Sequence, residues 1–231
     1  MIEVWIVILR GVQYAAGALL LGLPAFMLYS ARAIGPLNLR WPRPALIWAA
    51  AALTLAAPAA LLAQTAMMAG SLSEAVKPAS LSFMITGMGL GKAMVVRTLA
   101  AVLALAAALL LRPGRLMWGG LTLLGLIISA SFAWTGHGAA TEGSGHAVHL
   151  ISDIVHAVAA SVWIGALAAF AVLILRRPSG DATWDAGVAR SLTGFAGVGA
   201  AAVGALVVTG LINSAYLVGL FSSPQFAALL E

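Results

Sequence analysis

The residues best suited to chemistry in this chain are its four histidines and one nearby aspartate. All four histidines of the 231-residue sequence fall between His137 and His156. Steps of three, four and three residues separate His146, His149, Asp153 and His156. On an α-helix these steps place the side chains in one stripe along a single face. Imidazole and carboxylate groups are transition-metal ligands, so the stripe predicts a metal site that His137 would close from a neighbouring helix.

Other interpretations of these residues are open. Successive ligands on the stripe would lie about 5 Å apart along the helix axis, which also suits passing an ion down the helix. His137 and His146 fit solvated positions in a loop equally well. Asp153 falls inside an apolar segment, where an ionisable side chain is costly and usually faces a cavity or a partner. Its structural alternative is an ion pair with Arg10 or Arg97.

Methionine supplies a second set of candidate ligands. Met68 ends an apolar segment, and Met84 and Met88 follow in the more polar stretch after it. Thioether sulfur is a soft ligand that suits Cu(I), although methionine in an apolar helix usually fills space. Met84 and Met88 lie four residues apart, so a helix there would place them on one face. The sequence predicts that these methionines lie on the same side of the membrane as the histidines.

The composition indicates that membrane helices carry these residues. Hydrophobic residues make up 62% of the chain, charged residues make up 8%, and the mean hydropathy is +1.05. An ordinary soluble domain has about 25% charged residues and could not bury this much apolar surface. The absence of cysteine excludes disulfides and thiolate metal sites. The net charge of +5 comes from small basic groups between apolar runs, which is typical of membrane flanks and not of nucleic-acid binding.

The sequence predicts an all-α fold, a polytopic transmembrane helical bundle with about six spans in a single domain over residues 1–231. A membrane helix needs about 20 mostly apolar residues. The segments that meet this length are Val4–Tyr29, Ala45–Met67, Lys92–Leu111, Leu116–Trp134, Val148–Leu175 and Val188–Leu220. The last segment is long and rich in glycine, which predicts a tilt or a break near Asn213. Gly70–Leu90 is predicted to be an outer loop that leads into a short interfacial or re-entrant helix.

Basic residues predict the orientation of the spans. Eight of the 12 lysines and arginines lie in alternate connections between spans. They are Arg32, Arg40, Arg43, Arg112, Arg115, Arg176, Arg177 and Arg190. Cytoplasmic loops carry an excess of such residues. The N-terminus and the histidine-bearing loop are therefore predicted to lie outside the cytoplasm.

Sequence motifs for catalysis and for nucleotide binding are absent. The chain has no phosphate loop, no nucleophile elbow and no pair of catalytic carboxylates. The glycine-rich string Gly87–Gly91 lacks the preceding strand that a dinucleotide site needs. We therefore expect a protein that is not an enzyme and that is not driven by ATP.

Three motifs resemble the copper-resistance D (CopD) family of bacterial inner-membrane proteins. The strongest is Trp134-Thr-Gly-His137-Gly, followed by His146-x-x-His149-x-x-x-Asp153-x-x-His156 and by Trp163-x-Gly165-x-Leu167. The second is Met68-Ala-Gly70, and the third is Thr86-x-x-x-x-Gly91-Lys-Ala-Met94-x-x-Arg97. Met94 stands where the family usually has tryptophan. The first helix, with Arg10, Gln13-Tyr14, Gly22 and Phe26, is also similar.

The resemblance implies copper handling at the periplasmic side of the bacterial inner membrane, often uptake in concert with a small periplasmic copper carrier. It also implies two further helices that this chain lacks. The expected ligands of the copper ion are His137, His146, His149, Asp153, His156, Met68, Met84 and Met88. One alternative is a membrane electron carrier that binds haem b between His137 and His156. Another is a copper sensor or assembly partner that does not transport. Membrane lipid is an expected partner in every case.

Overall fold

Six long helices make up most of the part of the chain that the structure describes. The computed structural model describes residues 2–30, 33, 41–136, 139, 141 and 145–219, and every regular element in those ranges is a helix. The long helices are α1 (Ile2–Tyr29), α3 (Pro42–Ala69), α6 (Gly89–Leu110), α7 (Arg115–Ser131), α8 (His146–Leu175) and α9 (Ala182–Leu217). A 3₁₀ turn, η2 (Phe132–Thr135), extends α7. By length and composition all six can cross a membrane, which confirms the predicted all-α bundle and its spans.

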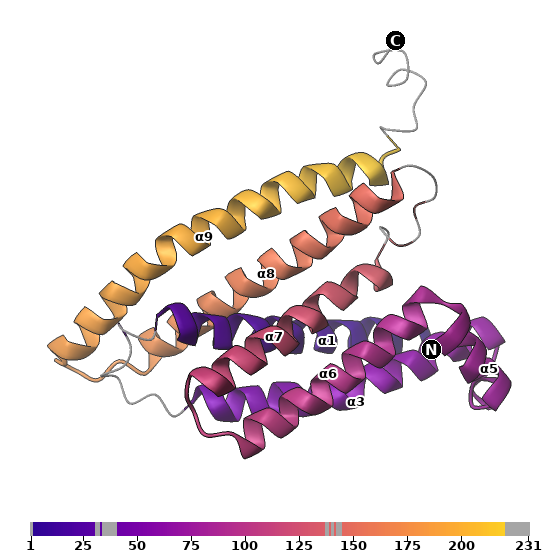
Figure 1. The fold of residues 1–231 in the computed structure, drawn as a ribbon, viewed down its shortest axis with the longest axis horizontal. Helices are drawn as coiled ribbons and strands as arrows, with labels where there is room; N and C mark the ends of the chain where they lie inside the picture. The colour runs from indigo at the N-terminus through magenta and orange to yellow at the C-terminus, as the bar shows by residue number, and fades with distance from the viewer. Residues whose placement is uncertain are drawn as a thin grey trace, which may run out of the picture.

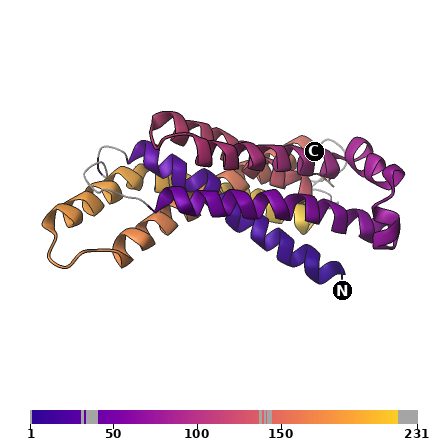
Figure 2. The same cartoon turned by 90° about the horizontal axis from the view of Figure 1, so that it is seen from below.

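The long helices run side by side along one axis, and the chain reverses direction after each (Figures 1 and 2). One end of the bundle, here called the α5 end, holds the short elements α4 (Leu72–Ala75), α5 (Pro78–Ser82) and the π-helix η1 (Phe83–Gly87). The start of α8 and the end of α9 lie at this end too. The opposite end, here called the Arg177 end, holds the connection between α8 and α9.

Helix α1 lies at the centre of the bundle, in contact with α3, α7 and α8. The shared core combines large side chains of α1, such as Leu20, Leu23 and Phe26, with alanines of α6 and α8. Small residues allow membrane helices to approach closely, which is the main source of packing energy where lipid is as apolar as the side chains. Helix α9 stands at the edge and packs chiefly on α8.

Two glycines set the contact between α1 and α8. A Cβ atom added to Gly165 would lie 2.4 Å from the Cα atom of Gly22, and one added to Gly22 would lie 2.4 Å from the carbonyl oxygen of Ser161. Backbone therefore meets backbone, and no larger residue fits at either position. This contact holds the histidine-bearing helix against the centre of the bundle.

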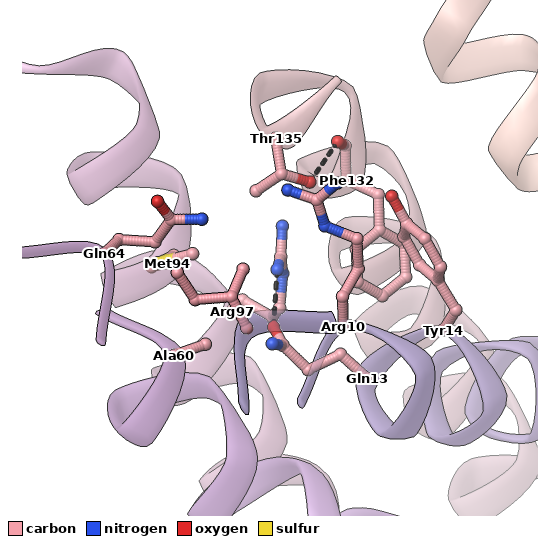
Figure 3. Close-up of a pocket in the computed structure, with 10 residues that line it drawn as sticks. Arg10, Gln13, Tyr14, Ala60, Gln64, Met94, Arg97, Phe132 and Thr135 are labelled. Atoms are coloured by element: carbon pink, nitrogen blue, oxygen red, sulfur yellow. Dashed lines mark hydrogen bonds between the residues drawn. The ribbon is translucent and has the colours of Figure 1, made fainter. Parts of the chain in front are cut away.

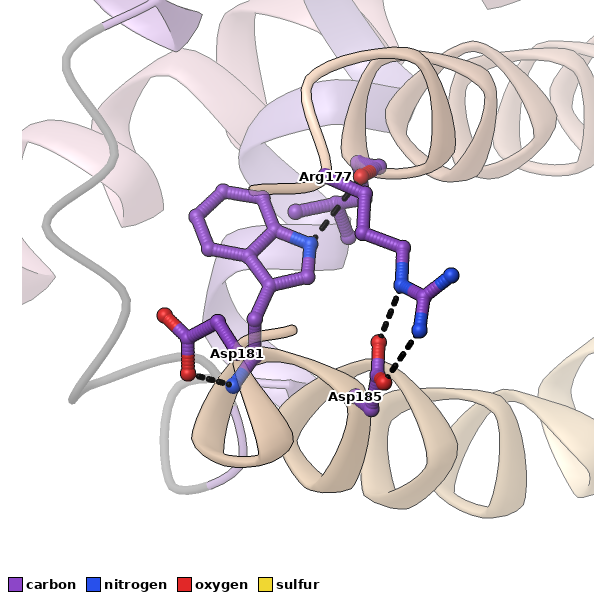
Figure 4. Close-up of polar contacts among 5 residues, drawn as sticks. Arg177, Asp181 and Asp185 are labelled. Atoms are coloured by element: carbon purple, nitrogen blue, oxygen red, sulfur yellow. Dashed lines mark hydrogen bonds and ion pairs between the residues drawn. The ribbon is translucent and has the colours of Figure 1, made fainter. Parts of the chain in front are cut away.

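Polar contacts fix the turn from α8 into α9 at the Arg177 end (Figure 4). Arg177 donates from Nε and Nη2 to the two carboxylate oxygens of Asp185, at 2.6 and 2.5 Å. This hydrogen-bonded carboxylate raises the pKa of Arg177. Asp181 caps α9 by accepting from the backbone N–H of Trp184, whose indole donates to the carbonyl of Leu173. Together these bonds set the register in which α9 returns along α8.

Two local details differ from the prediction. Of the tilt or break expected near Asn213, the break is absent: α9 continues through Asn213 to Leu217, because that side chain bonds to a neighbouring helix and does not compete for its own backbone. Met84 and Met88 do not share a helical face, since η1 ends at Gly87 and Met88 has extended backbone angles. The predicted short helix in Gly70–Leu90 is present, as the separate pieces α4, α5 and η1.

Candidate metal centre

A row of polar side chains joins α8 to α9 near the α5 end. As predicted, His146, His149, Asp153 and His156 all lie on one helix, α8. The row, here called the polar seam, is formed by His149, Ser152, Asp153 and His156 of α8 with Thr209, Asn213 and Tyr216 of α9. Burying a polar group in a membrane interior is costly unless it is hydrogen-bonded. The seam supplies partners for these side chains, although the buried Oδ1 atom of Asn213 has none among the described residues.

Each seam residue of the predicted stripe meets its own partner on α9. The ring of His149 stacks on Tyr216, with centroids 4.4 Å apart and planes 9° apart. Asn213 donates from Nδ2 to Oδ1 of Asp153 at 2.8 Å. Steps of four and then three residues separate 149, 153 and 156 on α8, and the same steps separate 209, 213 and 216 on α9. Because the two helices are antiparallel, a step of four on one helix faces a step of three on the other, and each of the three residues still meets a partner.

His156 is held in one tautomer by Thr209. Its Nδ1 atom lies 2.9 Å from Oγ1 of Thr209. The single hydroxyl hydrogen of Thr209 points to the carbonyl of Ala205, 2.6 Å away, so the hydroxyl accepts and the imidazole donates. The lone pair of neutral His156 is therefore on Nε2, the atom that a metal ion would bind.

The two outer histidines are oriented by Thr141. Nδ1 of His146 lies 2.9 Å from the carbonyl oxygen of Thr141, which can only accept, so here too the proton is on Nδ1. Nδ1 of His149 lies 2.6 Å from the hydroxyl of the same residue. His149 is buried, with 2% of its surface exposed. Metal-binding histidines usually have the nitrogen that does not bind fixed by such a hydrogen bond.

A cavity of about 390 Å³ opens beside the seam, between α1, η2 and α8. Asp153 and His156 both line it, together with Tyr14, Phe132 and Ser161. Gly136 closes one side near Asp153: a Cβ atom added there would lie 3.2 Å from Oδ2. A carboxylate and an imidazole thus share one cavity, which is large enough for an ion with bound water.

The methionines form a separate group at the α5 end. Met68 and Met84 line an open groove of about 370 Å³ with Thr65, Ser80 and Phe83. Met68 is half exposed and Met84 is fully buried. Met88 is half-buried and does not line this groove. The predicted placement of the methionines at the same end as the histidines agrees with the fold (Figure 1).

The described residues do not by themselves assemble a complete metal site. Among them, no three histidine, aspartate or glutamate side chains are close enough to hold one ion. The reason is geometric. Ligands on one helix are spread along its axis, and the residues that face them on α9 are Thr209, Asn213 and Tyr216, which add no histidine or carboxylate. His137, which would add a ligand from the next segment, lies outside the described residues. The haem alternative also requires His137 and stays a prediction.

The predicted structural alternative for Asp153 is wrong. Arg97 bonds to Gln13 and Ser131, and Arg10 forms no ion pair within the described ranges. Asp153 instead accepts from Asn213 on α9. The carboxylate therefore belongs to the polar seam and the cavity.

The sequence-based prediction did not include the contribution of α9. Thr209, Asn213 and Tyr216 orient the candidate ligands, but the sequence analysis considered Asn213 only as a possible site of a tilt or break in the helix. Their spacing of four and three residues is the signal that would have found them, because it mirrors the spacing of 149, 153 and 156.

A multi-pass helical membrane protein, with histidine and methionine clusters at one end, is the class that this fold and site define. Residues 1–147 match the model of the copper resistance protein D-like N-terminal domain. A curated relative, copper resistance protein D of Pseudomonas syringae pv. tomato, is 36% identical over 174 residues, which is 74% of this chain. The chain belongs to the copper resistance protein D family, a family of multi-pass proteins of the bacterial inner membrane.

The matching region is a part of the relative. The chain spans 54% of the length of that protein. No solved structure matches this chain. The matching domain model and the relative are both named for copper resistance, and the polar seam and its cavity are the parts of this chain whose side chains could bind a metal ion.

Proposed function

We propose that this protein binds copper at the α5 end, facing the periplasm, and moves it into the membrane along α8. The single observation that carries this is the shared cavity of Asp153 and His156. An imidazole whose lone pair is on Nε2 and a carboxylate one helical turn away form a ligand pair for a transition-metal ion. The copper-related family of the chain supports copper as that ion.

The path proposed for the ion follows the seam. His146 is the first residue of α8, so His146 and His137 would capture copper at the surface. His149, Asp153 and His156 then lie at successive depths about 5 Å apart. Copper is the cargo in this scheme, and each side chain serves as a temporary ligand.

The methionine groove would receive copper in its reduced form. Met68 and Met84 share one groove, and thioethers bind Cu(I) with little competition from protons. Met88 lies apart from the groove and would contribute only after movement of the η1 segment. A small periplasmic carrier protein could deliver copper at this end, where both clusters lie.

The test is copper binding followed by copper flux. Purified protein should bind copper, and a double substitution, His149→Gln with His156→Gln, should reduce bound copper per folded molecule by about tenfold or more. Arg115→Gln, a polar change at the Arg177 end, is the control and should bind like wild type. An unchanged copper content in the double variant contradicts the proposed site.

Flux separates a permease from a sensor or assembly partner. Protein in liposomes that contain a copper-sensitive dye should quench the dye when copper is added outside. Binding without flux would identify a non-transporting copper protein. Strong absorbance from bound haem after purification would favour the electron carrier instead.

A further inference from the structure

A buried arginine near the α5 end has only neutral partners. Arg97 on α6 has 1% of its surface exposed. Its Nη1 donates to Oε1 of Gln13 at 2.6 Å, and Nε and Nη2 donate to the hydroxyl and carbonyl of Ser131, both at 2.9 Å. The guanidinium carbon lies 4.3 Å from the centroid of the Phe132 ring. These contacts use three of five N–H groups, and no carboxylate among the described residues pairs with the positive charge.

A second arginine lines the same small cavity (Figure 3). Arg10 on α1 points toward it, and Gln64 approaches from α3. Within the described part of the chain, the ion pairs are Lys77 with Glu74 and Arg177 with Asp185. No carboxylate of the described residues therefore offsets either arginine. A buried positive charge without a counter-charge is costly, and a second positive charge that lines the same cavity adds repulsion, so the pair favours binding of an anion.

The other lining groups also favour a negative ligand. Gln64 forms no hydrogen bond to the described residues, so its amide N–H groups are available to donate. The hydroxyl hydrogen of Thr135 is used by the carbonyl of Phe132 at 2.6 Å. The donors that remain are the two guanidinium groups and one amide, the set that binds halide and carboxylate oxygen well.

We propose that Arg10, Gln64 and Arg97 form a binding site for one small monovalent anion, either chloride or the carboxylate group of a larger molecule. The cavity volume is about 10 Å³, close to the minimum that holds one water-sized group. That size suits one carboxylate oxygen and rejects a phosphate or sulfate group, and a chloride ion, which is larger than water, requires a small outward shift of the exposed Arg10 side chain.

The position of the site explains how an anion would reach it. Arg10 and Arg97 each lie eight residues beyond the first residue of their helices, Ile2 and Gly89. At 1.5 Å per residue both are about 12 Å from the α5 end. The Arg10 side chain is exposed at the surface of the bundle, so the cavity is not sealed on this side by other side chains. A bound anion would join α1, α3 and α6 around one shared charge.

Chloride is the first probe. Purified protein in a non-ionic detergent should broaden the ³⁵Cl NMR line of added sodium chloride, because bound chloride relaxes quickly. Arg10→Gln should lose most of this broadening and Arg10→Lys should keep part of it. Arg115→Gln, a matched loss of one exposed arginine at the Arg177 end, should broaden like wild type. Arg10 is used because its exposed side chain can be replaced without disturbing the core, as Arg97 cannot.

Thermal unfolding tests whether the site also binds a carboxylate group. Chloride or acetate, added at about ten times the dissociation constant, should raise the Tm of the wild-type protein by about 3 °C more than the same salt raises the Tm of Arg10→Gln. A rise in Tm with acetate but not with chloride identifies a carboxylate group as the ligand. If added acetate narrows the ³⁵Cl line, acetate displaces chloride and both anions share the site. Equal line widths for wild type and Arg10→Gln, with no rise in Tm from either anion, overturn the proposal.

Discussion

His156 of α8 donates a hydrogen bond to Thr209 of α9, with Nδ1 and Oγ1 2.9 Å apart. The bond crosses the interface between the two helices that bear the polar seam. Because the hydroxyl of Thr209 donates its single hydrogen to the carbonyl of Ala205, it can only accept a hydrogen bond from the imidazole ring. One residue on a neighbouring helix thereby fixes both the tautomer and the orientation of a candidate copper ligand.

Thr209→Val should weaken copper binding although it removes no ligand. Valine keeps the shape of threonine and cannot accept from Nδ1, so the ring loses its fixed tautomer. We expect the copper affinity to fall by about tenfold, the scale for the loss of such an orienting bond. Thr193→Val is the control, since that hydroxyl bonds only to Ala189 on its own helix. Equal affinities of the two variants in a competition titration would disprove the role of Thr209.

Asp153→Asn should reduce copper binding while the fold stays intact. The change keeps the size of the side chain and removes the charge that favours a cation in the cavity. We expect a loss of about tenfold or more in copper affinity or uptake. Bound copper per folded molecule is the measurement, with the Tm as a check on folding. A wild-type copper ratio in this variant would show that the carboxylate only holds Asn213.

Copper affinity should fall as the pH is lowered from 7.5 to 5.5. Protons compete with the metal for the imidazole lone pair, and free histidine side chains titrate near pH 6.5. An imidazole must be neutral to bind a metal ion, so protonation competes with binding and the affinity decreases as the pH falls. The expected decrease is about tenfold for one imidazole ligand and about a hundredfold for two. Affinity that does not vary over this range would indicate binding by methionine alone.

The helices were predictable because each is an apolar run of membrane-spanning length. The predicted span Val148–Leu175 and the observed α8 share their C-terminal boundary, and α8 begins two residues earlier. The prediction failed where a side chain changed the local preference. Asn213 suggested a break, yet its amide donates to Asp153 on another helix. No rule that considers one helix at a time could have supplied that partner.

The candidate site was predictable only as a stripe on one helix. The spacing of the histidines sufficed to place His149 and His156 on one face of α8. It could not reveal that His149 stacks on Tyr216, or that Asp153 faces a cavity closed by Gly136. These contacts join residues more than a dozen positions apart and depend on how the bundle is assembled. The same holds for Arg97, whose partners are on α1 and α7.

Reporter fusions should place the α5 end in the periplasm. Described basic residues gather at the opposite end, among them Arg43, Arg112 and Arg177, and cytoplasmic ends carry the excess of positive charge. A reporter inserted at Lys77 should be active only in the periplasm, and one inserted at Arg177 only in the cytoplasm. The reverse pattern would place both candidate clusters on the cytoplasmic side and would exclude capture of copper from outside.

Gly165→Ala should destabilise the protein through the contact between α1 and α8. The added Cβ atom would lie 2.4 Å from the Cα atom and 2.7 Å from the carbonyl carbon of Gly22, and backbone cannot rotate away as a side chain does. The helices must separate, at a cost of about 1–3 kcal/mol as in other overpacked interiors. For a chain of this size that lowers the Tm by about 5 °C. Gly119→Ala is the matched control, because nothing lies within 4 Å of its added Cβ atom and alanine favours the helix. Its Tm should equal or exceed that of wild type, and an unchanged Tm for Gly165→Ala would show that the two helices are not held in contact at this point.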